Sequence, residues 1–356
     1  MFPRATAIRA SLILACFLAG AGGPVSAGLD APPPGSFTIV VIPDTQGYRG
    51  SGAKATPGSR EPLTNSVFLN HTRWIAENRG EQNIVFVTHV GDIVDINRED
   101  QWQVARECLD RLHGVVPYSL TVGNHDMGSD GDASLFQRFF PEERFRRFEW
   151  YAGGYAHPRA DQQVSAGMVN SHQLFSAGGL DFVHLSLECN APDDVVAWAD
   201  AVLARCSDRL ALITTHMDLG PIEKPASGEG YFSDPKGRMD WIKIHGPRGN
   251  SPADLWRKLY SRHANVRIVF SGDQSRTESW TLSSPGPDGS PVHALMSDYT
   301  SSGPLRLIRF LPASEEIQVL TYDTTRHEKV TSTRLRPESS AHSFTLPMPR
   351  VIRTHR

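Results

Sequence analysis

The residues of this chain whose types and spacing could do chemistry lie in short segments that each follow an apolar run. The most distinctive segment is Gly123-Asn124-His125-Asp126, in which a carboxamide, an imidazole and a carboxylate follow a glycine. It comes directly after the apolar run 115–120, so we expect it at the turn that leaves a buried strand. Glycine permits a tight backbone path at such a turn. Taken alone, the segment could also be an ordinary turn, because Gly, Asn and Asp are common turn formers.

Four other segments repeat this arrangement of an apolar run followed by a polar side chain. The runs cover residues 37–42, 84–88, 210–214 and 266–270, and their β-branched content is typical of buried strands. Including the asparagine above, the polar residues that follow the five runs are Asp44, Asp92, Asn124, His216 and Asp273. Because α/β sheets place their ligands at the carboxyl ends of strands, we expect these five side chains to converge on one small volume.

A convergence of this kind favours a metal site. Carboxylates that lie close together raise one another's pKa strongly unless a cation neutralises them. Oxygen ligands mixed with an imidazole suit a hard or borderline divalent ion. A pair of such ions can hydrolyse phosphate esters, because together they lower the pKa of a bridging water and hold the phosphoryl oxygens. Asp44 and Asp92 could instead cap the helices that follow them, and Gly272-Asp273 could be ordinary turn chemistry.

The elements that must position these residues alternate as in a doubly wound α/β sheet. Helical patterns separate the first three strands, one after residue 61 and one over residues 99–112. Later in the chain the pattern predicts a β-hairpin that turns at residues 177–179. It also predicts helices over 193–204 and 252–262 and further strands near 277–282, 292–296, 305–310 and 317–322.

Four motifs carry a resemblance to a known family: Pro-Asp-Thr-Gln at 43–46, Gly-Asp-Ile-Val-Asp at 91–95, Gly-Asn-His-Asp at 123–126 and Thr-Thr-His at 214–216. In this order and spacing they resemble the metallophosphoesterase (calcineurin-like phosphoesterase) family, in a secreted bacterial-type branch with an Asp-x-Gln first motif. The resemblance implies an α/β fold, a four-layer αββα sandwich of two mixed β-sheets flanked by helices. It also implies divalent metal cofactors, up to two ions of Mn, Fe, Zn or Mg.

By that likeness, the motif residues divide into metal ligands and catalytic residues. Asp44 and Gln46 would hold the first metal, Asp92 would bridge the two, and Asn124 and His216 would hold the second.

The catalytic residues implied by the resemblance are His125 and Asp126. His125 would bind the phosphate and protonate the leaving group, and Asp126 would hold it in place. Asp95 would steady the loop.

Two departures from the family pattern bear on the metal pair. The first motif is usually Asp-x-His, and here Gln46 offers a carbonyl oxygen, which is a weaker ligand. The last motif is usually Gly-His-x-His, and here it reads Gly272-Asp273-Gln274-Ser275. Asp273 could replace one imidazole as a ligand, whereas Ser275 substitutes poorly for the other. The first metal would then have only Asp44, Gln46 and Asp92 as convincing ligands, so its affinity should fall. The sequence therefore predicts one firmly held metal, and another that is weak or recruited by substrate.

The N-terminus predicts export. Arg4 and Arg9 precede a short apolar stretch over residues 11–19, and small residues up to Ala27 end the segment. This is the pattern of a secretory signal peptide, cleaved after Ala27, and the apolar stretch is too short to anchor the chain across a bilayer. The protein is therefore expected to be secreted or periplasmic, with no transmembrane segment.

The remaining chain divides into a linker over 28–36, a metallophosphoesterase domain over 37–325 with an irregular aromatic insertion over 127–170, and a partly loose extension over 326–356. Of the cysteines after the signal peptide, Cys189 and Cys206 flank one helical pattern and could form a disulfide, and Cys108 is expected to be a buried thiol. The formal net charge of -3 and 21% charged residues give no nucleic-acid-binding signature.

Three functions fit these observations. The first is a secreted metal-dependent phosphoesterase that hydrolyses a small phosphomonoester or phosphodiester through a metal-activated hydroxide. The second is a degenerate relative that keeps the fold and binds a phosphorylated or anionic ligand without turning it over. The third is an exported interaction module whose active surface is the aromatic insertion.

Overall fold

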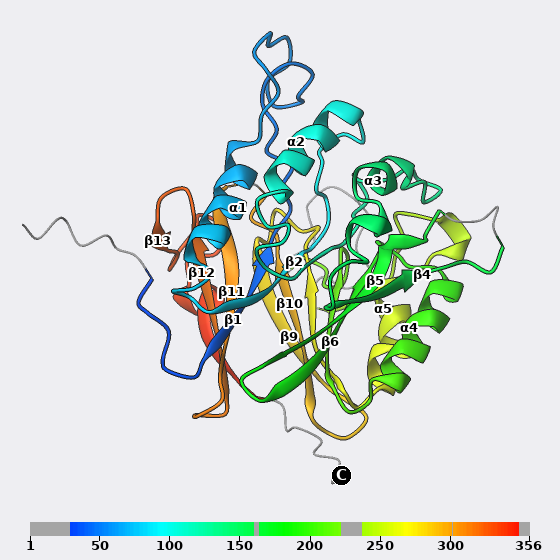
Figure 1. The fold of residues 1–356 in the computed structure, drawn as a ribbon, viewed down its shortest axis with the longest axis vertical. Coiled ribbons are helices and arrows are strands. Elements are labelled where there is room, and N and C mark those ends of the chain that lie inside the picture. The colour runs from blue at the N-terminus through cyan, green and yellow to red at the C-terminus, as the bar shows by residue number, and fades with distance from the viewer. Residues whose placement is uncertain (1–28, 160–163, 222–236, 301, 349–356) are drawn as a thin grey trace, which may run out of the picture.

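The computed structural model describes residues 29–159, 164–221, 237–300 and 302–348. The expected signal peptide and its cleavage site therefore lie outside the described residues. Within the described part, two seven-stranded β-sheets pack face to face, with helices on the outer side of each (Figure 1).

The first sheet has the strand order β13-β12-β11-β1-β2-β3, with β14 paired to β12. The adjacent strands β1, β2 and β3 are parallel, and the remaining pairs are antiparallel. Its strands are β1 (Phe37–Ile42), β2 (Ile84–His89), β3 (Tyr118–Leu120), β11 (Pro304–Leu311), β12 (Glu316–Asp323), β13 (Glu328–Lys329) and β14 (Ser343–Pro347).

The second sheet has the strand order β4-β5-β6-β7-β8-β10-β9. Strands β6, β7, β8 and β10 are parallel, and the outer pairs are antiparallel. Its strands are β4 (Tyr151–Tyr155), β5 (Gly167–Ala177), β6 (Leu180–Leu187), β7 (Leu210–Thr215), β8 (Val266–Ser271), β9 (Ser279–Pro285) and β10 (Pro291–Ser297).

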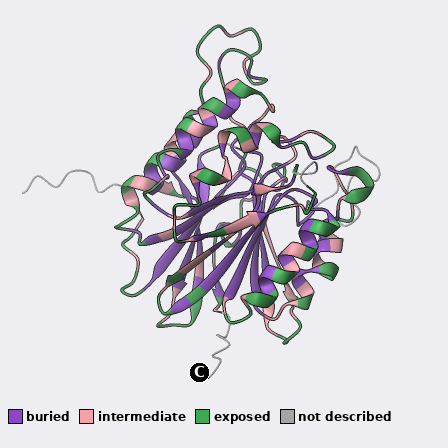
Figure 2. Cartoon of the chain, turned by 45° about the vertical axis from the view of Figure 1, so that its right-hand side comes forward, coloured by how far each residue is buried: buried purple, intermediate pink, exposed green. Residues whose placement is uncertain are grey.

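Alternating side chains of the central strands build the layers. Phe37, Ile39 and Val41 of β1 face the second sheet and form the core between the two sheets. Val40 and Ile42 face the opposite way, into the core under the helices of the first sheet. This period of two, with apolar side chains on both faces, is what a strand buried on both sides requires. Figure 2 shows the strands largely buried and the outer sides of the helices exposed.

The helices pack on the outer face of each sheet. Helices α1 (Ser66–Asn78) and α2 (Glu99–Leu109) pack on the first sheet, and α4 (Asp193–Arg205) and α5 (Pro252–Lys258) pack on the second. The predicted αββα sandwich of two mixed sheets is confirmed. The shorter helices are α3 (Ser134–Phe139), η1 (Glu142–Arg144), η2 (Gly246–Arg248), η3 (Tyr260–Arg262) and η4 (Ser339–Ala341).

The structure confirms the predicted hairpin and shortens one predicted helix. The predicted hairpin is confirmed, because β5 and β6 pair with Ala177 opposite Leu180. The helix expected over 99–112 already ends at Leu109, and the chain continues in turns. Within 127–170 the structure contains α3, η1, β4 and the start of β5.

The three cysteines in the described part of the chain are free thiols. Cys108 is a buried free thiol, as expected, whereas the disulfide considered between Cys189 and Cys206 is not formed. These two cysteines lie at opposite ends of α4, which spans Asp193–Arg205 and separates them. Among the described residues, we find no helix whose length and apolar content would let it cross a membrane.

Candidate metal centre

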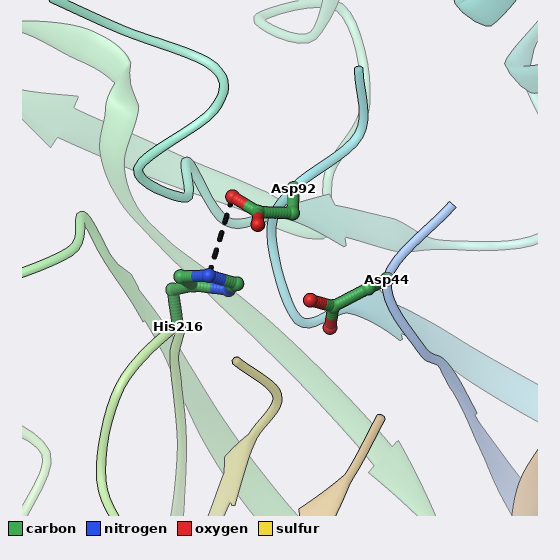
Figure 3. Close-up of side chains that lie close together, drawn as sticks. All are labelled: Asp44, Asp92 and His216. Atoms are coloured by element: carbon green, nitrogen blue, oxygen red, sulfur yellow. Dashed lines mark ion pairs between the residues drawn. The ribbon is translucent and has the colours of Figure 1, made fainter. Parts of the chain in front are cut away.

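Three of the predicted ligands meet at the edge where the two sheets face each other. Asp44 follows β1 and Asp92 follows β2 in the first sheet, and His216 follows β7 in the second. Each offers one ligand atom, and these atoms lie within 4.8 Å of one another. All three residues are buried. Figure 3 shows the two carboxylates and the imidazole directed toward a common space.

Hydrogen bonds between the sheets lie close to this edge. Thr88, the penultimate residue of β2, donates through its hydroxyl to Oγ1 of Thr214 in β7 at 2.8 Å. Ser119 of β3 donates in turn to Oγ1 of Thr88 at 2.9 Å. The first bond ties β2 of one sheet to β7 of the other near the ends from which the ligands follow, and the second joins β3 to β2 within the first sheet.

Glycines make the close approach of the ligands possible. A Cβ at Gly123 would overlap the carboxylate of Asp92, and a Cβ at Gly272 would overlap that of Asp44. A Cβ at Gly91 would lie 2.8 Å from Nδ1 of the histidine in the cluster, which is also too close. The Gly-Asp and Gly-Asn pairs of the sequence therefore have a packing reason, because only glycine leaves room for the neighbouring side chain.

Two acidic residues of the site adopt a left-handed backbone. Asp92 has φ 50° and Asp273 has φ 66°. Non-glycine residues seldom adopt this conformation, and it persists where the surrounding structure determines it, often at functional sites. Here it turns each carboxylate sharply away from the preceding strand and into the site.

His216 is oriented as a ligand. Its Nδ1 lies 3.0 Å from the backbone carbonyl of Val90, and because a carbonyl only accepts, Nδ1 carries the proton. Nε2 then faces the acids, at 3.2 Å from Oδ1 of Asp92 and 3.4 Å from Oδ1 of Asp273. Metal-binding histidines commonly have this arrangement, with one ring nitrogen bonded to a carbonyl and the other directed at the ion.

Burial and mutual repulsion shift the ionisation of these groups. Burial, with the charge of Asp298, raises the pKa of Asp44 well above its usual value. Burial also acts on Asp92, but the adjacent His216 outweighs it and holds the pKa of Asp92 below its usual range. For His216 itself, burial is outweighed by Asp92 and Asp273, and its pKa is raised well above 6.5. A bound divalent cation relieves such repulsion and takes the place of the proton on the imidazole.

Gln46 also reaches the site. Its Nε2 donates to Oδ2 of Asp92 at 2.9 Å. Rotation of the amide by half a turn would direct the carbonyl oxygen to the same place, so the side chain has the reach that a ligand needs.

The other two predicted ligands, Asn124 and Asp273, contact a residue that was not expected in the site, Lys243. Nζ of Lys243 lies 3.2 Å from Oδ1 of Asn124 and forms an ion pair with Asp273. Burial by itself would raise the pKa of Asp273, but the charge of Lys243 outweighs burial and lowers this pKa. Lys243 lies in a Gly/Pro-rich loop and follows no strand, so its local sequence gives no sign of a place in the site. Ser275, the poor substitute for an imidazole, is exposed.

The contacts of His125 and Asp126 differ from the expected ones. Nδ1 of His125 lies 2.8 Å from the backbone carbonyl of Asp95, so this carbonyl, rather than Asp126, orients the ring. The carboxylate of Asp126 accepts instead from the backbone N–H groups of Ile93, Val94 and Gly123, at 3.1, 2.9 and 2.8 Å. Asp126 is fully buried and thus ties two ligand-bearing loops together.

Comparison with known proteins gives one family, a curated relative and several similar solved structures. A sequence model described as calcineurin-like phosphoesterase matches residues 37–275. A curated relative, the uncharacterized protein YvnB of Bacillus subtilis (strain 168), is 28% identical over 329 residues, which cover 88% of this chain and 22% of the relative. The chain thus spans about a fifth of the length of that relative.

Similar solved structures include a 5'-nucleotidase precursor from Thermus thermophilus, with 14% identity, a TM-score of 0.46, and coverage of 88% of this chain and 54% of that one. Another is the calcineurin-like phosphoesterase YfkN from Bacillus subtilis, with 9% identity, a TM-score of 0.40, and coverage of 88% and 90%.

Proposed function

The chain belongs to the calcineurin-like phosphoesterase family, and from this premise we propose that it is an exported, metal-dependent hydrolase of small phosphate esters. The observation that carries the proposal is the convergence of Asp44, Asp92 and His216, buried and within 4.8 Å of one another, at the strand ends of both sheets. The signal-peptide pattern of residues 1–27 supports export.

The proposed ligands of the principal ion are Asp44, Gln46, Asp92 and His216. The family pattern gives His216 to the second metal, and here we assign it to the principal ion because its ligand atom groups with those of Asp44 and Asp92. The donor set fits a divalent cation, because it combines carboxylates with an imidazole whose Nε2 faces them. Glycines at 91, 123 and 272 leave the room that these side chains need around a common point. When bound, the ion supplies a water of lowered pKa and neutralises charge on the phosphoryl oxygens.

His125 is the proposed general acid. The carbonyl of Asp95 holds its Nδ1, so Nε2 is left to face the substrate side of the site. The side chain is 34% exposed, whereas that of Asp92, 4.0 Å from Nε2, is 5% exposed. His125 can therefore reach a leaving-group oxygen from solvent while staying beside the proposed ligands, and can donate the proton that the departing alkoxide needs.

The proposal is tested with purified chain, stripped by a chelator and then supplied with Mn²⁺, Fe²⁺, Zn²⁺ or Mg²⁺. Hydrolysis of p-nitrophenyl phosphate and bis-p-nitrophenyl phosphate should depend on the ion and disappear with the chelator. Asp92→Ala should lower activity by more than about 100-fold, the upper range for loss of a mere supporting partner of a ligand. Asp208→Ala, at an exposed position, is the matched control. Activity that survives both the chelator and Asp92→Ala would refute the proposal.

A second candidate, a ligand-binding relative that does not turn its ligand over, is favoured by one observation. The last motif offers no imidazole, because Asp273 and Ser275 stand where the family has histidines. In addition, Ser275 is exposed and Asp273 is paired with Lys243. The double change Asp273→His and Ser275→His separates the two functions. A large gain in hydrolysis would support the binding protein, and no gain would support a working native site.

A further inference from the structure

We propose that the ammonium of Lys243 occupies the position of the second divalent ion, so that the site holds one metal ion and one built-in organic cation. This inference rests on the proposed function, because it concerns the same site. It explains which cation accompanies the principal ion where the usual Gly-His-x-His motif is lacking.

The contacts of the ammonium are those expected of the second ion. Nζ of Lys243 lies 3.2 Å from Oδ1 of Asn124, one of the two residues that the family resemblance assigns to the second metal. It also pairs with Oδ1 of Asp273, and that same oxygen lies 3.4 Å from Nε2 of His216, the other assigned residue. The lysine thus shares its surroundings with both assigned ligands.

The position of Lys243 is fixed by the fold. Its backbone N–H donates to Oδ1 of Asn190 at 2.8 Å, and that of Ile244 donates to the same oxygen at 3.2 Å. Asn190 is buried, has φ 56°, and donates through Nδ2 to the carbonyl of Asn250 at 2.9 Å. The buried Asn190, just beyond the end of β6, therefore holds the loop that carries Lys243.

The side chain is enclosed as well as anchored. The side chain of Lys243 is 19% exposed, and Nζ lies 5.2 Å from the centre of the Trp241 ring, within the range of a cation–π contact. A largely buried ammonium needs hydrogen-bonding and anionic partners. Asn124 and Asp273 supply these partners here, and the Trp241 ring adds a cation–π contact. These contacts distinguish Lys243 from a lysine that merely lies near an acidic surface.

The departure at position 273 fits this arrangement. An imidazole at 273 would be a neutral or cationic neighbour of the ammonium, whereas the carboxylate of Asp273 attracts it. The acid and the lysine are therefore complementary. An ammonium and a divalent ion repel each other, so both cannot occupy the space between Asn124 and Asp273. With Lys243 in place, one divalent ion remains for Asp44, Asp92 and His216.

The test counts metal ions. Stripped chain is reconstituted with Mn²⁺, and bound ions are measured by elemental analysis and by electron paramagnetic resonance. Wild type should bind one equivalent and show the hyperfine pattern of an isolated Mn²⁺. Lys243→Ala should bind two equivalents and show an exchange-coupled pair. Lys243→Arg, which keeps a cation, and Lys329→Ala, which removes a surface lysine paired with Asp30, should stay at one.

The outcomes separate this inference from the proposed function. Two equivalents in wild type, or one equivalent in folded Lys243→Ala, would overturn the role of Lys243 and leave the proposed function standing. No bound ion in wild type would overturn both. If Lys243→Ala fails to fold, the wild-type spectrum still decides, because a coupled pair contradicts the inference and an isolated ion supports it.

Discussion

Nε2 of His216 lies 3.2 Å from Oδ1 of Asp92, although the two residues follow strands of different sheets. The imidazole comes from β7 and the carboxylate from β2, and the hydroxyls of Thr88 and Thr214 bond between the same two strands. The site is therefore a product of sheet packing, and each half of the sandwich contributes ligands that the other half cannot replace.

His216→Ala should lower metal affinity by more than about 100-fold, since it removes a nitrogen ligand and not merely a supporting partner. Competition with a fluorescent chelator measures the affinity directly, without reference to activity. His263→Ala removes a histidine paired with Asp200 away from the site and serves as the control. Equal affinities in the two variants would show that the imidazole at 216 is not a ligand.

His125→Ala should lower turnover by about 10²- to 10⁴-fold, the usual contribution of a general acid. The loss should depend on the leaving group, because p-nitrophenolate departs without much protonation and an alkyl alkoxide does not. Metal content should stay that of wild type. A loss of the same size for both classes of ester would contradict a role in proton donation.

Gly123→Ala should disturb the site by crowding, since the added Cβ would overlap the carboxylate of Asp92. We expect destabilisation of about 1–3 kcal/mol, typical of overpacking, together with weaker metal binding. Denaturant unfolding and metal titration measure the two effects. Gly80→Ala is the matched control, because a Cβ there meets nothing within 4 Å. Wild-type metal binding in Gly123→Ala would show that the glycine is not needed for ligand geometry.

Asp126→Asn should destabilise the fold by about 1–3 kcal/mol, because a buried group that accepts three backbone N–H bonds is replaced by one that has an N–H₂ of its own. The variant should loosen the two loops that carry Asp92 and Asn124. Hydrogen exchange of the Ile93 and Val94 amides reports this directly. If those amides stay protected, the carboxylate does not hold the loops.

The pH dependence of stability should include a contribution from His184. Burial lowers the pKa of His184 to about 3, and both ring nitrogens are bonded, to Gln173 at 2.9 Å and Thr214 at 2.8 Å. The unfolded value is about 6.5, so between these values the unfolded chain binds a proton that the folded chain does not. This stability is present above about pH 6.5 and is lost on acidification, by about 1.4 kcal/mol per pH unit.

Urea unfolding of wild type and His184→Gln over a pH series isolates that contribution. The free energy of unfolding should fall less steeply with acidification in His184→Gln, since the titrating group is gone. Parallel slopes in the two proteins would contradict the buried neutral state of this histidine.

The sequence by itself determined which strands are buried and which polar residues follow them. The alternation in β1, with Val40 and Ile42 on one face and Ile39 and Val41 on the other, follows from a period of two that any strand imposes. The same local logic placed Asp44, Asp92 and His216 just beyond buried strands. These relations are short in sequence, so the pattern of side chains is enough to predict them.

Only the tertiary structure decided which groups touch. Lys243 reaches Asn124 across 119 residues, and its loop is anchored by Asn190 across 53 residues. The ring of His125 is held by the carbonyl of Asp95, not by the adjacent Asp126. Backbone carbonyls carry no sequence signature, and a loop's path depends on what it packs against. The local sequence pattern therefore determines which side chain follows each strand. The packing of the two sheets determines which groups that side chain contacts.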